Sequence, residues 1–308
     1  MDDKLNVTYL IVGGYLEVHK YRYLYFVIVL TAYILIITCN SIIVYLIWIH
    51  QNLHEPMYIF IAALLINAIL WSTAICPKLL NDFLSEKQII SYSACLLQFY
   101  LIYSLGSSEF FLLAAMAYDR YVSICKPLQY HTIMRKTKVS ILLIFAWILP
   151  ASLIAVATGL SSHKKLCGFV LKSVFCNNTV YKLQCGIAIA ETIRDMVGLL
   201  INALSPLLFI LFTYIRILRI CYQSNKEVRR KAAQTCLPHL IVLTNFSCLC
   251  FFDVITIQLD LDFPEILRLI MTFLLIMFHP LLNPIIYGLK IKEIFKHLKT
   301  LFLSVKQI

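Results

Sequence analysis

Residues 24–49 read LYFVIVLTAYILIITCNSIIVYLIWI and contain no charged side chain. A membrane-spanning helix needs about 20 consecutive, mostly apolar residues, so this run is long enough to cross a bilayer. Six further runs of the same kind lie at roughly 57–83, 93–118, 139–160, 188–215, 237–258 and 267–288. Runs of this length differ from the alternating segments of about ten residues that build a membrane barrel. We therefore predict an all-α membrane protein whose receptor domain, residues 24–288, is a bundle of seven transmembrane helices.

The composition of the chain supports a membrane protein. Of its 308 residues, 61% are hydrophobic and only 14% are charged, against about 25% charged residues in soluble domains. The formal net charge of +11 is a feature that nucleic-acid-binding proteins can show. Here the basic residues lie in short loops between apolar runs, so we expect a lipid bilayer and no nucleic acid as a partner.

The distribution of Lys and Arg predicts the orientation in the membrane, because cytoplasmic loops carry an excess of them. The loops near 50–56, 119–138 and 216–236 together with residues 289–308 hold 16 of these residues, and the opposite side holds 8. We therefore expect residues 1–23 to be an extracellular tail and the first apolar run to act as an uncleaved signal anchor. Residues 289–308 should form a cytoplasmic amphipathic helix that lies on the membrane interface, followed by a tail.

The predicted extracellular side carries modification signals. Asn6 begins a glycosylation sequon, and we predict a glycan there; Asn177 begins a second sequon whose use is left open. The same side holds Cys95 and, in the long loop, three more cysteines, which favours disulfides in an oxidising compartment. Four cysteines allow three pairings, and their spacing does not choose among them.

Several short sequence motifs lie at or near the ends of the apolar runs. The longest, residues 116–125 (MAYDRYVSIC), lies where the third run reaches the predicted cytoplasm. An isolated Asp-Arg pair there could be a plain interfacial anchor, but the string is accompanied by PMY at 56–58, TYIRIL at 213–218, KAAQTC at 231–236 and PLLNPIIY at 280–287. Together these strings resemble the motifs of the vertebrate odorant receptors, a family of rhodopsin-like class A G-protein-coupled receptors, over nearly the whole chain. The short loops and the Pro206 region are similar to fish members.

The resemblance implies roles for particular residues. It implies disulfides Cys95–Cys176 and Cys167–Cys185 over a ligand cavity, and a coupling switch built from Asp119, Arg120, Tyr121, Tyr214, Asn283, Pro284 and Tyr287. Proline removes a backbone donor and crowds the preceding turn. We therefore expect Asn283-Pro284 to break the seventh helix, and Tyr214 and Tyr287 to swing toward Arg120.

The second and third runs differ in how well they match the family. The family's sodium-binding cluster has an aspartate where this chain has Ala68, while its other acid is present as Glu109. A buried lone carboxylate is costly, so Glu109 should be protonated, hydrogen-bonded or close to a cation such as sodium. No metal or cofactor is otherwise expected.

Depth along the runs predicts where a ligand would bind, because pockets in helix bundles lie between helices. The predicted residues are Ile102, Tyr103, Gly106, Ser107, Gly198, Asn202, Ser247, Phe251 and Phe273, and each of them also fits plain packing. Arg194, near the outer end of the fifth run, either extends its charge to water or binds an anionic group of the ligand.

These observations lead to a predicted function. A small-molecule odorant would bind from outside and activate a heterotrimeric G protein of the stimulatory olfactory type, raising cyclic AMP, in the plasma membrane of olfactory neuron cilia. The alternative is a class A chemosensory receptor outside olfaction. Transporters and channels usually place several charges inside the membrane or contain repeats, whereas only Glu109 is interpreted as deep. No catalytic constellation is visible, so no enzyme is expected; the odorant and the oligomeric state are left open.

Overall fold

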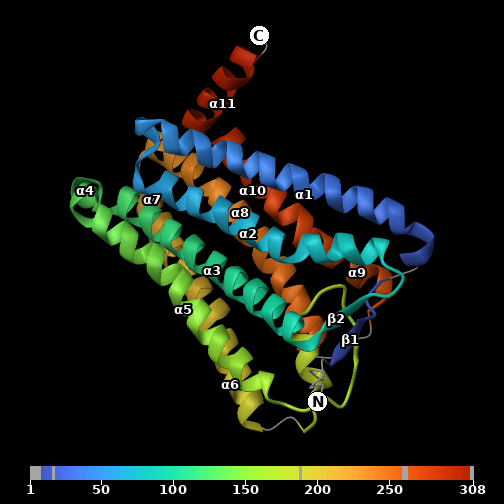
Figure 1. Cartoon of the computed structure of the whole chain (residues 1–308). Helices are drawn as coiled ribbons and strands as arrows, with labels where there is room; N and C mark the ends of the chain where they lie inside the picture. The colour runs from blue at the N-terminus through green and yellow to red at the C-terminus, as the bar shows by residue number, and fades with distance from the viewer. Residues whose placement is uncertain (1–7, 16–17, 187–188, 259–262, 306–308) are drawn as a thin grey trace.

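The protein is a bundle of long helices with a small β-sheet at one end (Figure 1). The computed structural model describes residues 8–15, 18–186, 189–258 and 263–305. Asn6, the predicted glycosylation position, lies outside the described residues. The first strand and the last helix lie at opposite ends of the bundle, as an odd number of crossings requires (Figure 1).

Seven helical segments are long and apolar enough to cross a membrane, which confirms the predicted fold class. They are α1 (Val18–Ile49), α2 (Pro56–Leu84), α3 (Tyr92–Cys125), α5 (Lys136–Ser162), α6 with α7 (Ile189–Leu199 and Ser205–Gln223), α8 (Lys226–Gln258), and α9 with α10 (Glu265–Phe273 and His279–Lys290). The short helix α4 (Tyr130–Ile133) lies between α3 and α5, and α11 (Lys292–Val305) follows the last span. Helix α8 begins before the predicted 237, so it extends beyond its apolar run.

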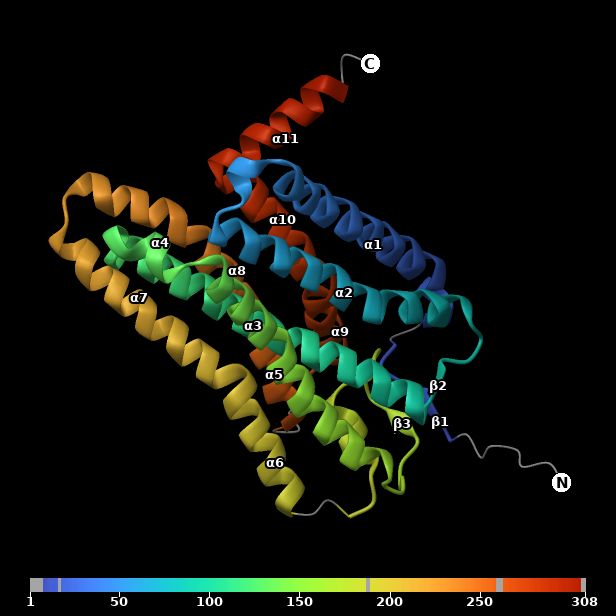
Figure 2. The same ribbon diagram turned by 60° about the vertical axis from the view of Figure 1, so that its left-hand side comes forward.

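Helix α3 lies at the centre of the bundle and packs against α2, α5, α7 and α8 (Figure 2). Peripheral helices expose large apolar side chains; on α5, Ile144 is 61% and Ile148 is 63% exposed. Leaving such side chains in water would cost about 1.5–3 kcal/mol each. The outer surface therefore suits lipid, while the inner faces form one continuous core.

The N-terminal segment is a strand in a three-stranded sheet, which the interpretation of residues 1–23 as a tail did not include. Strand β1 (Tyr9–Val12) pairs antiparallel with β2 (Ile89–Ser91) and parallel with β3 (Val170–Leu171). Leu10 and Val12 alternate with exposed neighbours and are buried against both loops. The sheet thus ties residues 9–12 to the loops that contain β2 and β3.

Gly14 makes this arrangement possible. A Cβ atom at Gly14 would come within 2.6 Å of the Ser173 Cα atom, so only glycine allows the two backbones to approach this closely. The next residue, Tyr15, donates its phenol hydrogen to the Asp82 carboxylate at 2.9 Å. Burial, with the charge of Asp82, raises the pKa of the Tyr15 phenol, which keeps it a donor.

The prediction that Asn283-Pro284 breaks the seventh helix is wrong. Helix α10 continues through Pro284, and the irregularity is a π-helical turn, Leu274–Phe278, just before Pro280. Pro284 removes the N–H that would bond the Pro280 carbonyl, and the Asn40 Nδ2 amide donates to that carbonyl at 3.2 Å. A side chain of α1 therefore satisfies the acceptor that the proline leaves open. A second π-helical turn, Leu200–Leu204, similarly precedes Pro206 in the fifth span.

Helix α11 turns away from the bundle axis at the end where α1 and α2 are connected (Figures 1 and 2). Ile294 is fully buried against the bundle, whereas Phe295 is exposed. The His297 ring stacks on His50 with centroids 3.8 Å apart. The predicted C-terminal helix is therefore present and fixed at its base, while its contact with lipid stays a prediction.

Candidate ligand cavity and cytoplasmic switch

A cavity of about 680 Å³ opens in the half of the bundle that carries the sheet. Its walls come from α3, α5, the fifth span, α8 and the loop before α6. Pockets for small organic ligands typically measure about 300–1,000 Å³. The cavity is therefore large enough for a small molecule.

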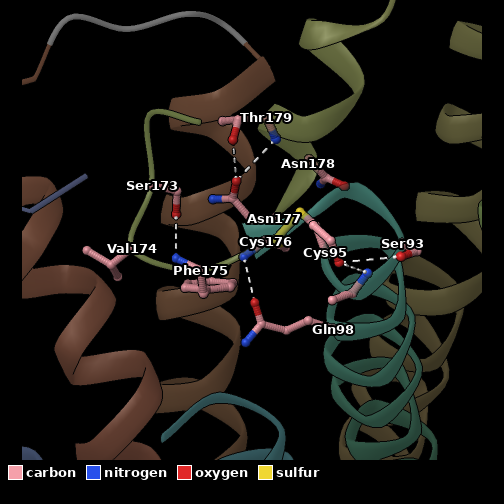
Figure 3. Close-up of a disulfide and its surroundings, with 12 residues drawn as sticks. Ser93, Cys95, Gln98, Ser173, Val174, Phe175, Cys176, Asn177, Asn178 and Thr179 are labelled. Carbon is pink, nitrogen blue, oxygen red and sulfur yellow. Dashed lines mark hydrogen bonds between the residues drawn. A yellow bond between two sulfur atoms is a disulfide. The ribbon is translucent and has the colours of Figure 1, made fainter. Parts of the chain in front are cut away.

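The loop over the cavity is fastened to α3. The structure contains both disulfides that the resemblance implies, with Cα atoms 5.4 Å apart in Cys95–Cys176 and 5.0 Å apart in Cys167–Cys185. Beside the first bridge, the Cys176 N–H donates to Gln98 Oε1 at 3.1 Å (Figure 3). The neighbouring Phe175 lines the cavity. These contacts hold the loop as a lid.

Aromatic rings form the wall below this lid. Phe99 stacks on Tyr103 with centroids 4.3 Å apart and meets the edge of Tyr181 at 5.0 Å. The Tyr103 hydroxyl accepts a hydrogen bond from the Asn178 N–H at 3.1 Å. Burial, with the nearby charge of Asp195, raises the pKa of Tyr181 to about 12, so this wall is neutral at physiological pH.

The structure brings most of the predicted ligand residues together. Ser247 and Phe273 are not among the residues that line the cavity; the Phe273 ring instead stacks on Tyr25 of α1 with centroids 6.2 Å apart. Depth along a helix does not specify which face a residue occupies, and these two occupy other faces. The remaining eight line the cavity, and their contact with a ligand stays a prediction: Ile102, Tyr103, Gly106, Ser107, Arg194, Gly198, Asn202 and Phe251.

Arg194 has an internal counter-ion. Its Nε donates to the Asp195 carboxylate at 2.9 Å, and its guanidinium carbon lies 5.9 Å from the centre of the Tyr181 ring. The adjacent negative charge offsets the positive charge that an anionic ligand would need. The structure therefore gives little support to anion binding by Arg194.

Asp253 is the polar residue that the sequence interpretation missed. It lies on α8, close to the end of the candidate span at Thr256, and lines the cavity. Among the described residues, no hydrogen bond or ion pair is formed by the Asp253 carboxylate. The signal in the sequence was an acidic residue inside the apolar run 237–258.

Glu109 has protein partners below the cavity. His279 Nε2 lies 2.6 Å from Glu109 Oε1, and Asn283 Nδ2 donates to the same oxygen at 3.3 Å. Asn245 Nδ2 donates to His279 Nδ1 at 3.0 Å, which places the ring proton on Nε2, facing Glu109. These hydrogen bonds are enough to explain why Glu109 can be buried. Sodium binding near Glu109 stays a prediction.

At the opposite end of α3, Asp119 and Arg120 form an ion pair. Arg120 Nε donates to Asp119 Oδ2 at 3.0 Å, and a second contact joins the guanidinium to the same oxygen. Tyr130 of α4, which the sequence interpretation did not include, donates to Asp119 Oδ1 at 2.8 Å. Tyr121 is half-buried against the core. The pair is thus neutralised and held inside the protein.

A histidine joins three helices beside this pair. His239 of α8 accepts from the Tyr214 hydroxyl at 2.6 Å, and its Nε2 donates to the Leu113 carbonyl of α3 at 2.9 Å. Tyr214 is therefore bound to His239, not to Arg120, in this structure. The Tyr287 hydroxyl is buried without a hydrogen-bond partner among the described residues. His239 follows three residues after the string 231–236, but spacing alone gave it no role.

This architecture defines a class. A seven-helix membrane bundle with a lidded cavity at one end of its central helix and an Asp-Arg pair at the other is the architecture of a class A G-protein-coupled receptor. Among the described residues, no group of three or more His, Cys, Asp or Glu side chains could hold a metal ion.

Comparison with known proteins gives the family. The family model described as "Olfactory receptor" matches residues 29–305. The chain is 34% identical to human Olfactory receptor 6N1, covering 94% of this chain and 93% of the relative, and 32% identical to human Olfactory receptor 11A1, covering 98% and 96%. It is 33% identical to mouse Olfactory receptor 5M5, covering 94% and 92%. The chain belongs to the olfactory receptor family.

The family makes it a multi-pass membrane protein that is not an enzyme, with a ligand and a G protein as its classes of partner. These relatives are mammalian, and the similarity to fish members stays a prediction.

Proposed function

We propose that this chain is an odorant receptor that binds a small extracellular molecule in its cavity. The bound state would activate a heterotrimeric G protein of the stimulatory olfactory type and raise cyclic AMP. The observation that carries the proposal is the position of both sites on α3: Tyr103 and Gly106 line the cavity, and Asp119 and Arg120 form the buried pair further along the same helix.

A conformational equilibrium would link the two sites. His239 attaches α8 to α3 and α7, so an outward displacement of the cytoplasmic part of α8 requires these hydrogen bonds to break. The cavity includes residues of α8 such as Phe251. A ligand that binds the displaced conformer more tightly shifts the population toward it. The opened groove would then receive the G protein.

The proposed location is the plasma membrane of olfactory neuron cilia, with the N-terminus outside. A chemosensory receptor in another tissue would use the same cavity and switch. Because both alternatives use the same cavity and switch, the tissue in which the receptor is expressed distinguishes them.

The experiment compares two arginines on the predicted cytoplasmic side. Arg120→Ala removes the cation of the buried pair, and Arg135→Ala removes an exposed cation at the start of α5. Both variants carry an N-terminal epitope tag, and cells are tested for ligand-evoked cyclic AMP with a panel of amines, alcohols and acids. We expect Arg120→Ala to lose the response at normal surface expression and Arg135→Ala to retain it.

A normal cyclic-AMP response of Arg120→Ala at matched surface expression would contradict the role proposed for the pair. A wild-type receptor that reaches the surface, binds a ligand and evokes no cyclic AMP would contradict the proposed G-protein type.

A further inference from the structure

The acidic side of the cavity points to a class of ligand. Asp253 projects from α8 into a cavity whose wall is mostly apolar and aromatic. A carboxylate in such surroundings has lost part of its hydration, and a cation or hydrogen-bond donors would offset this loss. Among the described residues, none supplies Asp253 with a hydrogen bond or an ion pair.

The basic residues of the lining do not fill this role. Arg194 is paired with Asp195 at 2.9 Å, and Lys182 is an exposed residue of the loop that makes a contact of its own. The charges of Arg194 and Asp195 cancel each other. Asp253 is thus the acid in the described lining whose charge has no counter-ion.

A second acceptor lies in the same cavity. Asn202, on the π-helical turn before Pro206, is 95% buried, and its Oδ1 atom has no hydrogen-bond donor among the described residues. It also lines the cavity. Two acceptors without donors, one charged and one neutral, favour a ligand that brings N–H or O–H groups.

Aromatic rings complete the environment of a cation. Asp253 and Tyr103 line the same cavity, and Tyr103 belongs to the stacked cluster with Phe99 and Tyr181. A cation within about 6 Å of an aromatic face is attracted by the negative face of the ring. Carboxylate and rings together therefore favour an ammonium group.

We infer that the cavity binds a small protonated amine with an apolar body. The ammonium group donates to Asp253, Asn202 Oδ1 accepts a further hydrogen bond from the ligand, and the apolar body packs on the aromatic wall. This inference rests on the proposed function, because it names the ligand class of the same cavity.

The test uses ligands that differ only in their head group: hexylamine, hexanol and hexanoic acid, and phenylethylamine, phenylethanol and phenylacetic acid. Purified receptor is scored by ligand-induced thermal stabilisation, and tagged receptor in cells by cyclic AMP. Asp253→Asn removes the charge at nearly constant volume, and Asp253→Glu retains it. Glu265→Gln is the control, since Glu265 is an exposed acid at the start of α9.

We expect the amines to bind best to the wild type. Asp253→Asn should weaken them roughly 10- to 100-fold, as expected for a charge-assisted hydrogen bond, and leave the alcohols unchanged. Asp253→Glu should retain part of the preference, and Glu265→Gln all of it.

Amines that bind no better than the alcohols, or an Asp253→Asn variant that keeps full amine affinity, would overturn the inference. Stabilisation by amines without cyclic AMP would support the inference and contradict the proposed function. A cyclic-AMP response to alcohols or acids alone would support the proposed function and contradict the inference.

Discussion

Glu109 and His279 show how single residues decide which polar groups the interior tolerates. Both side chains are almost completely buried, and each forms hydrogen bonds with the other and with an asparagine. An ionisable group inside a membrane helix is expensive unless it is paired. The pairing therefore explains why Glu109 can lie in the middle of α3.

Removing the His279 side chain should leave the buried Glu109 carboxyl without its shortest hydrogen bond. We expect His279→Ala to lower the stability of the receptor by about 3–5 kcal/mol, the usual effect of removing one partner of a buried pair. Thermal unfolding of the purified receptor measures the loss. Adding Glu109→Gln to His279→Ala should recover part of it, because the neutral amide is less costly to bury.

His131→Ala, at an exposed position of α4, is the matched control and should unfold as the wild type does. Equal melting temperatures of His279→Ala and wild type would show that the pair contributes nothing to stability.

The N-terminal strand is the feature that matters most at the scale of elements. Strand β1 joins two loops that are far apart in the chain, and Gly14 and Tyr15 attach its end to the lid and to α2. Residues 9–15 and the two disulfides therefore both hold the lid over the cavity.

A side chain at position 14 should disturb this attachment. We expect Gly14→Ala to cost about 1–3 kcal/mol, because the new methyl group would overlap the Ser173 backbone. The melting temperature of the purified receptor should fall accordingly.

Gly159→Ala on α5 is the control, since nothing lies within 4 Å of the added atom. If both alanine variants melt at the same temperature, the close approach at Gly14 is not required.

The whole molecule separates two chemical environments along one axis. The sheet lies at one end of the bundle and α11 at the other (Figure 1). The Cys95–Cys176 disulfide lies at the start of α3, beside the lid of the cavity, and the Asp119-Arg120 pair lies near the end of the same helix. The excess of Lys and Arg near the end of α3 that carries this pair predicts that this end faces the cytoplasm. Glycosylation tests this orientation, because glycans are attached only on the lumenal side.

We expect glycosidase treatment to shift the wild-type band on a gel, and Asn6→Gln to abolish that shift. Asn177→Gln should retain it, because Asn177 is buried and its Oδ1 accepts hydrogen bonds from Thr179 (Figure 3). A wild-type chain without any glycan would argue against an extracellular N-terminus. A shift lost only in Asn177→Gln would show that the glycan is on Asn177 and would contradict the predicted use of Asn6.

The sequence by itself determined the features that depend on local composition. Apolar runs long enough to span a bilayer predicted seven helices, since backbone groups in lipid must bond within their own segment, and the motif strings gave the family that the comparisons show. Most predicted ligand positions also lie on the cavity, because depth along a helix follows directly from residue number.

Only the tertiary structure decided which groups meet across the bundle. Helix rotation turned Phe273 toward Tyr25 and Asp253 into the cavity, and residue number does not set that rotation. Asn40 reaches the carbonyl opened by Pro284, and His279 reaches Glu109, although 240 and 170 positions of sequence separate the joined residues. Contacts of this kind arise from the packing of whole helices, so no local pattern in the chain records them.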